Sequence, residues 1–511
     1  MGLTELQFFF FASITILLYC ILPKKIQWLV LLVASMVFYA TYGLEKLPFL
    51  LVSALIAWFA ARQMDKVQQS EKKAAVAKKR CKRVLLLAVA GLVVLLLYAK
   101  IGTWAVQSIS ALLSWKAGST MQAIVALGVS YYTFSLISYL ADVYWRKDQA
   151  EQNYFRLLLF TIYFPKILQG PISRHKNLAP QLMEPHKFDY KEFCYGLQLM
   201  LWGYFKKMVI ADRLAVLVNS VFNDPDQYSG SHFLVAACFA SVQLYCDFSG
   251  CMDIVGGFSQ ILGLKLEANF ERPFFSRSAS EFWRRWHITL GTWFKDYVYM
   301  PLVISPRLIG VSKTLRQKFG LRAGKAFMSV VPLSAVWLLT GLWHSTGWNY
   351  VVWGVYWGAI IICSTVFAPE IKKLTELLHI NTKAGSWEIF QMIRTFALFT
   401  VGRILTAPGD LQISTQIFHK LIFDFQPAVL VDGTLYTLGL DRPNFILSIV
   451  CIFVLWGVGI VQEKGVCVRD KIAESNIVFR WAIYYIGFFS ILIFGMYGPG
   501  YDASSFVYMN F

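Results

Sequence analysis

Apolar runs long enough to cross a lipid bilayer recur along almost the whole of this chain, and they limit what it can fold into. About 17 to 25 residues of helix cross the hydrocarbon core. Only helices or a closed barrel satisfy every backbone group in lipid, and these runs lack the alternation of barrel strands. The sequence therefore predicts an all-α polytopic membrane protein with about eleven transmembrane helices. The apolar runs lie at residues 6–22, 26–42, 48–61, 84–99, 123–140, 193–218, 233–262, 326–343, 350–367, 390–404, 445–461 and 479–496.

The positive charge of the chain is concentrated between apolar runs. The formal net charge is +18, yet only 15% of residues are charged, against about a quarter in soluble domains. Residues 62–83 hold nine Lys or Arg and two acids, and residues 307–325 hold six basic residues and no acid. By the positive-inside rule both blocks are expected to be cytoplasmic loops, in reach of anionic lipid. A nucleic-acid partner is not expected.

The early topology follows from the same rule. If the first basic block is cytoplasmic, Lys24 and Lys25 are also inside and the N-terminus is outside. The first apolar run lacks a basic segment before it, so we interpret it as a mature helix and not as a cleaved signal peptide. The nine cysteines form no CxxC pair, and neither disulfides nor a metal cluster are expected.

Polar and irregular sequence is concentrated in the middle of the chain. We expect a single membrane-embedded domain in which residues 1–120 are a helical scaffold, 121–368 the functional core and 369–511 further helices. Within the core, Gly, Pro and charged residues interrupt hydrophobic sequence. Irregular backbone at membrane depth is tolerated only where protein or a wet cavity surrounds it. The middle region is therefore expected to contain re-entrant or interfacial helices and the functional site.

His344 is the most informative of the seven histidines. It ends an apolar run, and helical spacing places Trp337 and Thr340 on the same face. An ionisable residue within membrane sequence usually faces a bundle interior or cavity. Imidazole titrates near neutrality, so it can accept a proton from a hydroxyl nucleophile and return it. A hydrogen-bonded histidine that ties two helices is the structural alternative, and the residue chemistry alone leaves both open.

His287 lies in the sequence EFWRRWHITLGTW. As one interfacial amphipathic helix, this segment would place Trp283, His287, Leu290 and Phe294 on a common face. Cations on the other faces are candidates for binding the phosphates of a nucleotide-bearing donor. Contact with lipid headgroups explains each of them equally well. The candidate donor-binding residues are Trp283, Arg284, Arg285 and Lys295.

Asp247 lies within an apolar run. Its carboxylate could pair with Arg272 or Arg277, orient a histidine or relay protons, and we favour a buried structural ion pair. His175 follows a Gly-Pro break that indicates a helix end or re-entrant turn, and we favour a structural role for it. Neither His287 nor His344 has the close-spaced partners that a zinc site needs.

Several strings, in order, resemble the membrane-bound O-acyltransferase family, especially its bacterial branch containing the membrane subunit of alginate O-acetylation. The resemblance covers nearly the whole chain, including the opening LPKKIQWLV and the closing FVYMNF. The strings are GVSYYTFSLISYLADVY (128–144), FPKILQGPISR (164–174), WGYFKKMVIADRL (202–214), DFSGCMDIVGG (247–257), EANFERPFFSRSASEFWRRWHITLGTWFKDYVYMPL (267–302) and GLWHSTGWNYVVWG (341–354).

The resemblance implies a helical bundle around a central tunnel in a bacterial cytoplasmic membrane. It implies that His344 is the essential histidine and that His287 lies toward the cytoplasmic side. The expected reaction is transfer of an acetyl group from acetyl-CoA to a hydroxyl of an extracytoplasmic polysaccharide, directly or through an extracytoplasmic partner protein. No permanently bound cofactor or metal is expected, and Asp247, Trp343 and Asn349 are candidates for lining the tunnel or orienting the histidine.

Two alternatives stay open. Within the family, the chain could transfer D-alanine from a carrier protein to teichoic acid; from another class, it could be a transporter or flippase. The absence of recognisable repeats weakens the interpretation of the chain as a transporter. The sequence departs from the family pattern at LVISPRL (302–308), at Ser345 and at Trp357, which leaves the donor loop and the acceptor open. With no activated Cys or Ser evident, direct transfer without an acyl-enzyme is expected.

Overall fold

The computed structural model describes residues 1–112 and 127–497 of the chain. Within them the structure is helical, with one isolated bridge between Phe270 and Trp286 in place of any strand. The closing residues 506–511, which contribute to the family resemblance, lie outside the described part. The chain divides into two compact units, the first formed by Met1–Gly203 and Cys251–Glu267, the second by Tyr204–Gly250 and residues 268–497.

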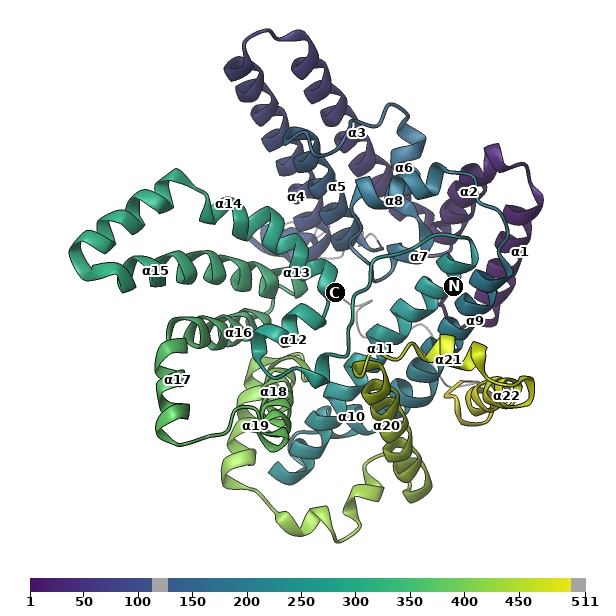
Figure 1. Cartoon of the computed structure of the whole chain (residues 1–511), viewed down its shortest axis with the longest axis vertical. Coiled ribbons are helices and arrows are strands. Elements are labelled where there is room, and N and C mark those ends of the chain that lie inside the picture. The colour runs from purple at the N-terminus through teal and green to yellow at the C-terminus, as the bar shows by residue number, and fades with distance from the viewer. Residues whose placement is uncertain (113–126, 498–511) are drawn as a thin grey trace. The chain divides into compact units, whose positions relative to one another are not determined.

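The first unit contains the N-terminal helices and the end of α11. Its longest elements, α3 and α4, pack side by side as a helical hairpin (Figure 1). Its aromatic core includes Phe8, Phe38 and Phe164. The ring centroid of Phe38 lies 6.3 Å from that of Phe8 and 5.3 Å from that of Phe164. The helices are α1 (Leu6–Ile21), α2 (Gln27–Ala40), α3 (Leu47–Ser70), α4 (Ala74–Leu112), α5 (Val129–Tyr144), α6 (Tyr154–Ile162), α7 (Phe164–Ile167), α8 (His175–Met183) and α9 (Tyr190–Tyr204).

The second unit contains the two predicted histidines. One part of its core is apolar and includes Leu214, Phe233 and Ile417, all fully buried. The π-helical turns Phe205–Ala211 and Lys295–Tyr299 interrupt its helices. The helices are α10 (Asp212–Phe222), α11 (Gly230–Ile261), α12 (Ala279–Arg285), α13 (Ile288–Phe294), α14 (Met300–Val303), α15 (Pro306–His344), α16 (Trp348–Val366), α17 (Ala368–Leu377), α18 (Gly385–Thr406), α19 (Leu411–Phe423), α20 (Arg442–Glu463), α21 (Val468–Glu474) and α22 (Ile477–Phe494).

Eight helices in the described residues are long and apolar enough to cross a membrane, and α1 is a shorter apolar helix. The polytopic helical architecture is confirmed, whereas the predicted number of about eleven spans is not. The difference has local causes. The run at 26–42 forms a helix of 14 residues, the π-helical turn divides the run at 193–218, and the run at 123–140 begins outside the described residues.

The second basic block is a helical hairpin, and its cytoplasmic location stays a prediction. α15 includes residues 307–325 and doubles back at Gly320, whose φ of 86° is not helical (Figure 1). Ser312 donates a hydrogen bond to the carbonyl of Gly324 across the bend, at 3.0 Å. Leu, Arg, Lys, Gln and Ala favour helix, and glycine allows the one left-handed residue that the turn requires.

Candidate functional site

His344 lies in the last turn of α15, in the second unit, and is 5% exposed. Three aromatic rings surround its imidazole. The ring centroids of Trp343 and Trp353 lie 4.8 and 5.3 Å away, nearly perpendicular to it. Tyr350 lies 5.8 Å away and is close to parallel. The histidine is thus enclosed by aromatic surface from α15 and α16, as predicted for a residue facing the interior.

The chain forms this pocket because α15 ends abruptly and α16 returns against it. Ser345 is extended and ends α15, and its hydroxyl accepts a hydrogen bond from the backbone N–H of Gly347 at 3.2 Å. The two helices cross closely. A Cβ atom on Gly354 would lie 2.6 Å from the carbonyl oxygen of Trp337, closer than non-bonded atoms tolerate. Glycine there permits the approach that brings Tyr350 and Trp353 onto His344.

His287 does not lie on a continuous amphipathic helix, and that prediction is wrong. α12 ends at Arg285, Trp286 forms a bridge with Phe270, and His287 takes a left-handed conformation with φ of 46° before α13 begins. Trp283 and His287 therefore do not share a helical face. His287 is 3% exposed, so it is buried in the unit and not at an exposed interface.

Asn269 determines the tautomer of His287. The backbone N–H and the hydroxyl of Thr289 donate to Asn269 Oδ1 at 3.1 and 2.7 Å, which identifies that atom as the acceptor. His287 Nδ1 lies 3.3 Å from the same oxygen and must therefore donate its proton. Nε2 is then the nitrogen with the lone pair. Burial lowers the pKa of His287 to about 3, so the ring is neutral at physiological pH.

Trp343 contacts the rings of both predicted histidines. Its ring centroid is 5.8 Å from that of His287 and 4.8 Å from that of His344. Phe248 contacts His287 at 4.8 Å, with the rings perpendicular. The structure thus brings His287, Trp343 and His344 together from segments far apart in sequence. Asn349, in the first turn of α16, is buried in the same unit.

The predicted donor-binding residues are dispersed. Trp283 packs against three tryptophans of α15 and α16 at ring distances of 5.0 to 5.5 Å. Arg285 forms ion pairs with Glu281 at 2.8 Å and Glu463 at 2.9 Å, so carboxylates already compensate its charge. Arg284 and Lys295 are exposed. The early end of α12 separates these side chains, and their contact with a donor stays a prediction.

Asp247 forms a buried ion pair, with a partner that the sequence did not indicate. Lys207 Nζ lies 2.6 Å from Asp247 and 2.8 Å from Asp212, and all three residues are buried. The two arginines considered as partners bind elsewhere, Arg272 to Glu463 and Arg277 to Glu388, each at 2.7 Å.

Sequence reasoning missed Asn269, Lys207 and Tyr350. Lys207 lies in a quoted string, WGYFKKMVIADRL, in which two adjacent lysines within apolar sequence were a signal for a buried carboxylate partner. Asn269 had no such signal, because its role depends on the bend at His287. Within residues 1–112 and 127–497, no group of three or more His, Cys, Asp and Glu side chains could hold a metal ion.

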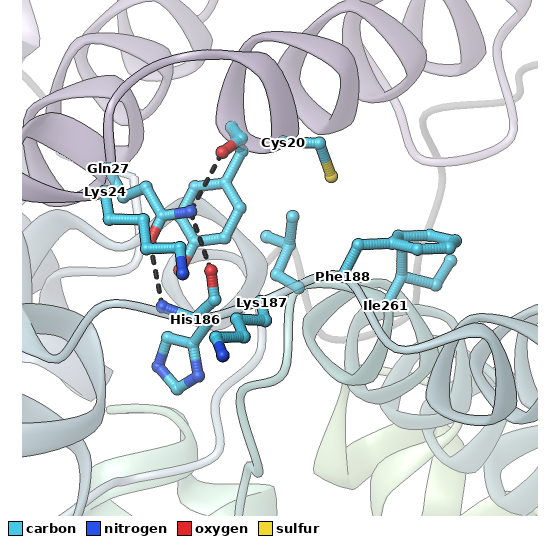
Figure 2. Close-up of a pocket in the computed structure, with 9 residues that line it drawn as sticks. Cys20, Lys24, Gln27, His186, Lys187, Phe188 and Ile261 are labelled. Atoms are coloured by element: carbon cyan, nitrogen blue, oxygen red, sulfur yellow. Dashed lines mark hydrogen bonds between the residues drawn. The ribbon is translucent and has the colours of Figure 1, made fainter.

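The first unit contains a separate small cavity of about 200 Å³. The amide nitrogen of Gln27 donates to the carbonyls of Tyr19 and His186 at 3.0 Å, and its oxygen accepts from the backbone N–H of His186 at 2.9 Å (Figure 2). Gln27 therefore ties the segment before α9 to the turn between α1 and α2. The cavity is lined by Tyr19, Cys20, Lys24, Gln27, His186, Lys187, Phe188, Ile261 and Leu262.

Comparison with known proteins decides the family. Residues 146–398, which include both central histidines, match the sequence profile of the MBOAT, membrane-bound O-acyltransferase family. The chain is 30% identical over 418 residues to a Pseudomonas syringae pv. tomato protein named "Probable alginate O-acetylase AlgI". That match covers 81% of this chain and 73% of the relative. The chain belongs to the membrane-bound O-acyltransferase family. It is a multi-pass membrane O-acyltransferase of the branch that resembles alginate O-acetylases, so the prediction of an enzyme is confirmed.

Other members of the family act on different polymers. The peptidoglycan O-acetyltransferase of Helicobacter pylori is 28% identical, over 68% of this chain and 65% of that protein. The teichoic acid D-alanyltransferase of Bacillus subtilis is also 28% identical, but over 48% of this chain and 60% of that protein. The acetyl-transferring relatives thus match more of the chain than the D-alanyl-transferring one.

Proposed function

We propose that this O-acyltransferase moves an acetyl group from acetyl-CoA to a hydroxyl of an extracytoplasmic polysaccharide, with His344 as the general base. The observation that supports this most directly is the enclosed histidine. His344 is buried at the end of α15 and surrounded by three aromatic rings. Such an environment excludes bulk water, which would otherwise hydrolyse a thioester.

The reaction needs one proton acceptor that can also donate. His344 takes the proton of the acceptor hydroxyl as its oxygen attacks the thioester carbonyl carbon. The new C–O bond forms, the C–S bond breaks, and the imidazolium returns the proton to the departing thiolate. Atoms and charge balance without an acyl-enzyme. A labelled acetyl group that stays on the denatured protein would contradict direct transfer.

His287 has a positioning role in this proposal. It is neutral, its Nδ1 proton is donated to Asn269, and its ring contacts Trp343, which also contacts His344. A neutral imidazole fixed in one tautomer can hold a donor group without competing for the acceptor proton. We therefore expect His287→Ala to lower acetyl-CoA turnover more than the removal of an exposed histidine does.

The membrane location, the donor and the acceptor are inferred from the relatives. We place the protein in a bacterial cytoplasmic membrane, with acetyl-CoA or an acyl carrier protein inside. Outside, the acceptor is a polysaccharide, reached directly or through an extracytoplasmic acetyl-transferring partner. D-alanyl transfer to teichoic acid is the second candidate, supported by the shorter match to the Bacillus subtilis protein.

The test is consumption of acetyl-CoA by purified protein in liposomes, with and without candidate polysaccharides and partner proteins. We expect His344→Ala to lower turnover by about 100-fold or more. The matched control is His419→Ala, which removes an exposed histidine of the same unit and should leave turnover unchanged. Full activity in His344→Ala would overturn the general-base role. If wild type does not consume acetyl-CoA but turns over a D-alanyl carrier, D-alanyl transfer to teichoic acid is favoured instead.

A further inference from the structure

A lone buried cation lies in the first unit, in the string FPKILQGPISR. Lys166, in α7, is 3% exposed, and its ammonium is 3.7 Å from the ring centroid of Phe160. Among the described residues, its Nζ has no hydrogen-bond partner. Buried charges in proteins are normally paired or bound to a ligand, because leaving water without compensation is costly. A ring face alone compensates only part of that cost.

Two further buried side chains of the same segment, Gln169 and His175, also have polar atoms without a partner in the described residues. Gln169 is 1% exposed, and within the described structure neither its amide nitrogen nor its oxygen has a partner. His175 is 8% exposed; its Nδ1 lies 2.9 Å from Asp148 Oδ2, while its Nε2 has no partner in the described part of the chain. The ring of Phe160 contacts both His175, at 5.1 Å, and Lys166. His175, at the start of α8, thus adds a further buried polar atom to those of Lys166 and Gln169.

The acid that acts on Lys166 does not satisfy these polar atoms. Glu267 acts on Lys166 through its charge, but its two oxygens accept hydrogen bonds from Ser173, at 2.6 Å, and Asn177, at 3.4 Å. Burial lowers the pKa of Lys166 to about 7, and Glu267 offsets only part of that effect. The ammonium form therefore needs a further negative group to be stable in this position.

A cleft at the end of α3 is lined by Asp148, the hydrogen-bond partner of His175. The cleft has a volume of about 610 Å³. Arg146 and Lys147 line the same cleft, as do Asp65 and Gln68 at the end of α3. These residues adjoin the first basic block, which the positive-inside rule places in the cytoplasm.

We propose that Lys166, Gln169 and His175 form an anion-binding site for a small oxyanion group, a carboxylate or a phosphate, that enters from the cytoplasmic side. Lys166 supplies the charge and the Gln169 amide supplies a donor. His175 contributes Nε2, while its Nδ1 keeps the contact with Asp148. The site is independent of the His344 chemistry, and its ligand can be a free anion or the phosphate of a larger cytoplasmic molecule.

The experiment uses the purified full-length chain, with acetate, inorganic phosphate and CoA titrated separately at constant ionic strength. The readout is the midpoint of thermal unfolding, which rises when a ligand binds the folded state. We expect at least one probe to raise the midpoint of wild type, and Lys166→Met to weaken that response about tenfold or more in apparent affinity. A response to CoA that Lys166→Met removes assigns the anion to the nucleotide, because CoA bound at the donor site would stabilise the variant as it does wild type. A Lys166-dependent response to acetate or phosphate without one to CoA assigns it to a free anion.

Three variants make the outcome specific. Lys176→Met removes an exposed lysine of the same segment and should leave the response unchanged. His344→Ala should also keep it, which separates this site from the transfer reaction. Gln169→Leu repeats the test if Lys166→Met does not fold. The proposal is overturned if no probe shifts wild type, or if the Lys166 and Gln169 variants respond as wild type does.

The pH dependence provides a second readout. The titratable group whose charge acts on Lys166 is Glu267, and the ring of Phe160 lies against both Lys166 and His175. Since the anion binds the ammonium form, apparent affinity should fall as pH rises through about 7. Lys166→Arg keeps its charge and should flatten this dependence above pH ~7. A wild-type affinity that does not change over this range would contradict the role of Lys166.

Discussion

At the scale of single residues, Asn269 is the side chain on which the geometry of His287 depends. Its Oδ1 accepts from His287 and twice from Thr289. We predict that Asn269→Leu lowers the free energy of unfolding by about 1–3 kcal/mol, because buried donors lose their acceptor. Turnover should fall about tenfold or more, since the imidazole loses its fixed tautomer. Denaturant unfolding in detergent and acetyl-CoA turnover measure the two effects.

The control variants separate the effect of His287 orientation from a general loss of stability. Asn269→Asp keeps an oxygen acceptor and should retain more activity than the Leu variant. Asn223→Leu, at an exposed position of the same unit, should change neither quantity. Wild-type turnover in a folded Asn269→Leu protein would show that the tautomer of His287 does not matter.

Lys207 is the second residue with a predictable effect. It compensates two buried carboxylates, Asp247 and Asp212. Lys207→Met leaves both without their cation, and we expect a loss of about 3–5 kcal/mol in unfolding free energy. Adding Asp247→Asn and Asp212→Asn should recover much of that loss, whereas Lys295→Met, at an exposed position, should cost little. A triple variant no more stable than Lys207→Met would contradict the ion-pair explanation.

At the scale of elements, the crossing of α15 and α16 determines whether the aromatic pocket forms. Gly354 allows the close approach, since a Cβ there would meet the carbonyl of Trp337 at 2.6 Å. We predict that Gly354→Val separates the helices, lowers the thermal midpoint and reduces turnover by about tenfold or more, because His344 lies at the end of α15. Thermal unfolding and turnover of the same preparations provide the measurement.

A matched glycine provides the control for this crossing. Gly457 lies in α20, and an added Cβ would meet nothing within 4 Å. Gly457→Ala should be neutral or stabilise the protein by up to about 1 kcal/mol, since alanine favours helix. If both substitutions have equal effects, the close approach of α15 and α16 is not what positions the site.

At the scale of the whole molecule, the distribution of charge predicts the orientation of the N-terminal helices in the membrane. The turn containing Glu45 should be extracytoplasmic, and the turn containing Lys73, within the first basic block, cytoplasmic. Both positions are exposed. We expect a membrane-impermeant thiol reagent to label Glu45→Cys in intact cells and Lys73→Cys only after permeabilisation. The unsubstituted protein measures background labelling of its nine cysteines, and the reverse pattern would invert the topology.

The sequence alone determined that the chain is helical and crosses a membrane, because hydrophobicity and helix length are local properties that lipid selects directly. It also indicated the two histidines, since an ionisable group in apolar sequence is unusual wherever the helices pack. Tertiary structure decided the surroundings of those histidines. Asn269 reaches His287 across 18 residues and Lys207 reaches Asp247 across 40, and no local pattern specifies such pairs. The left-handed bend at His287 is likewise held by packing, which overrides the helical propensity of its neighbours.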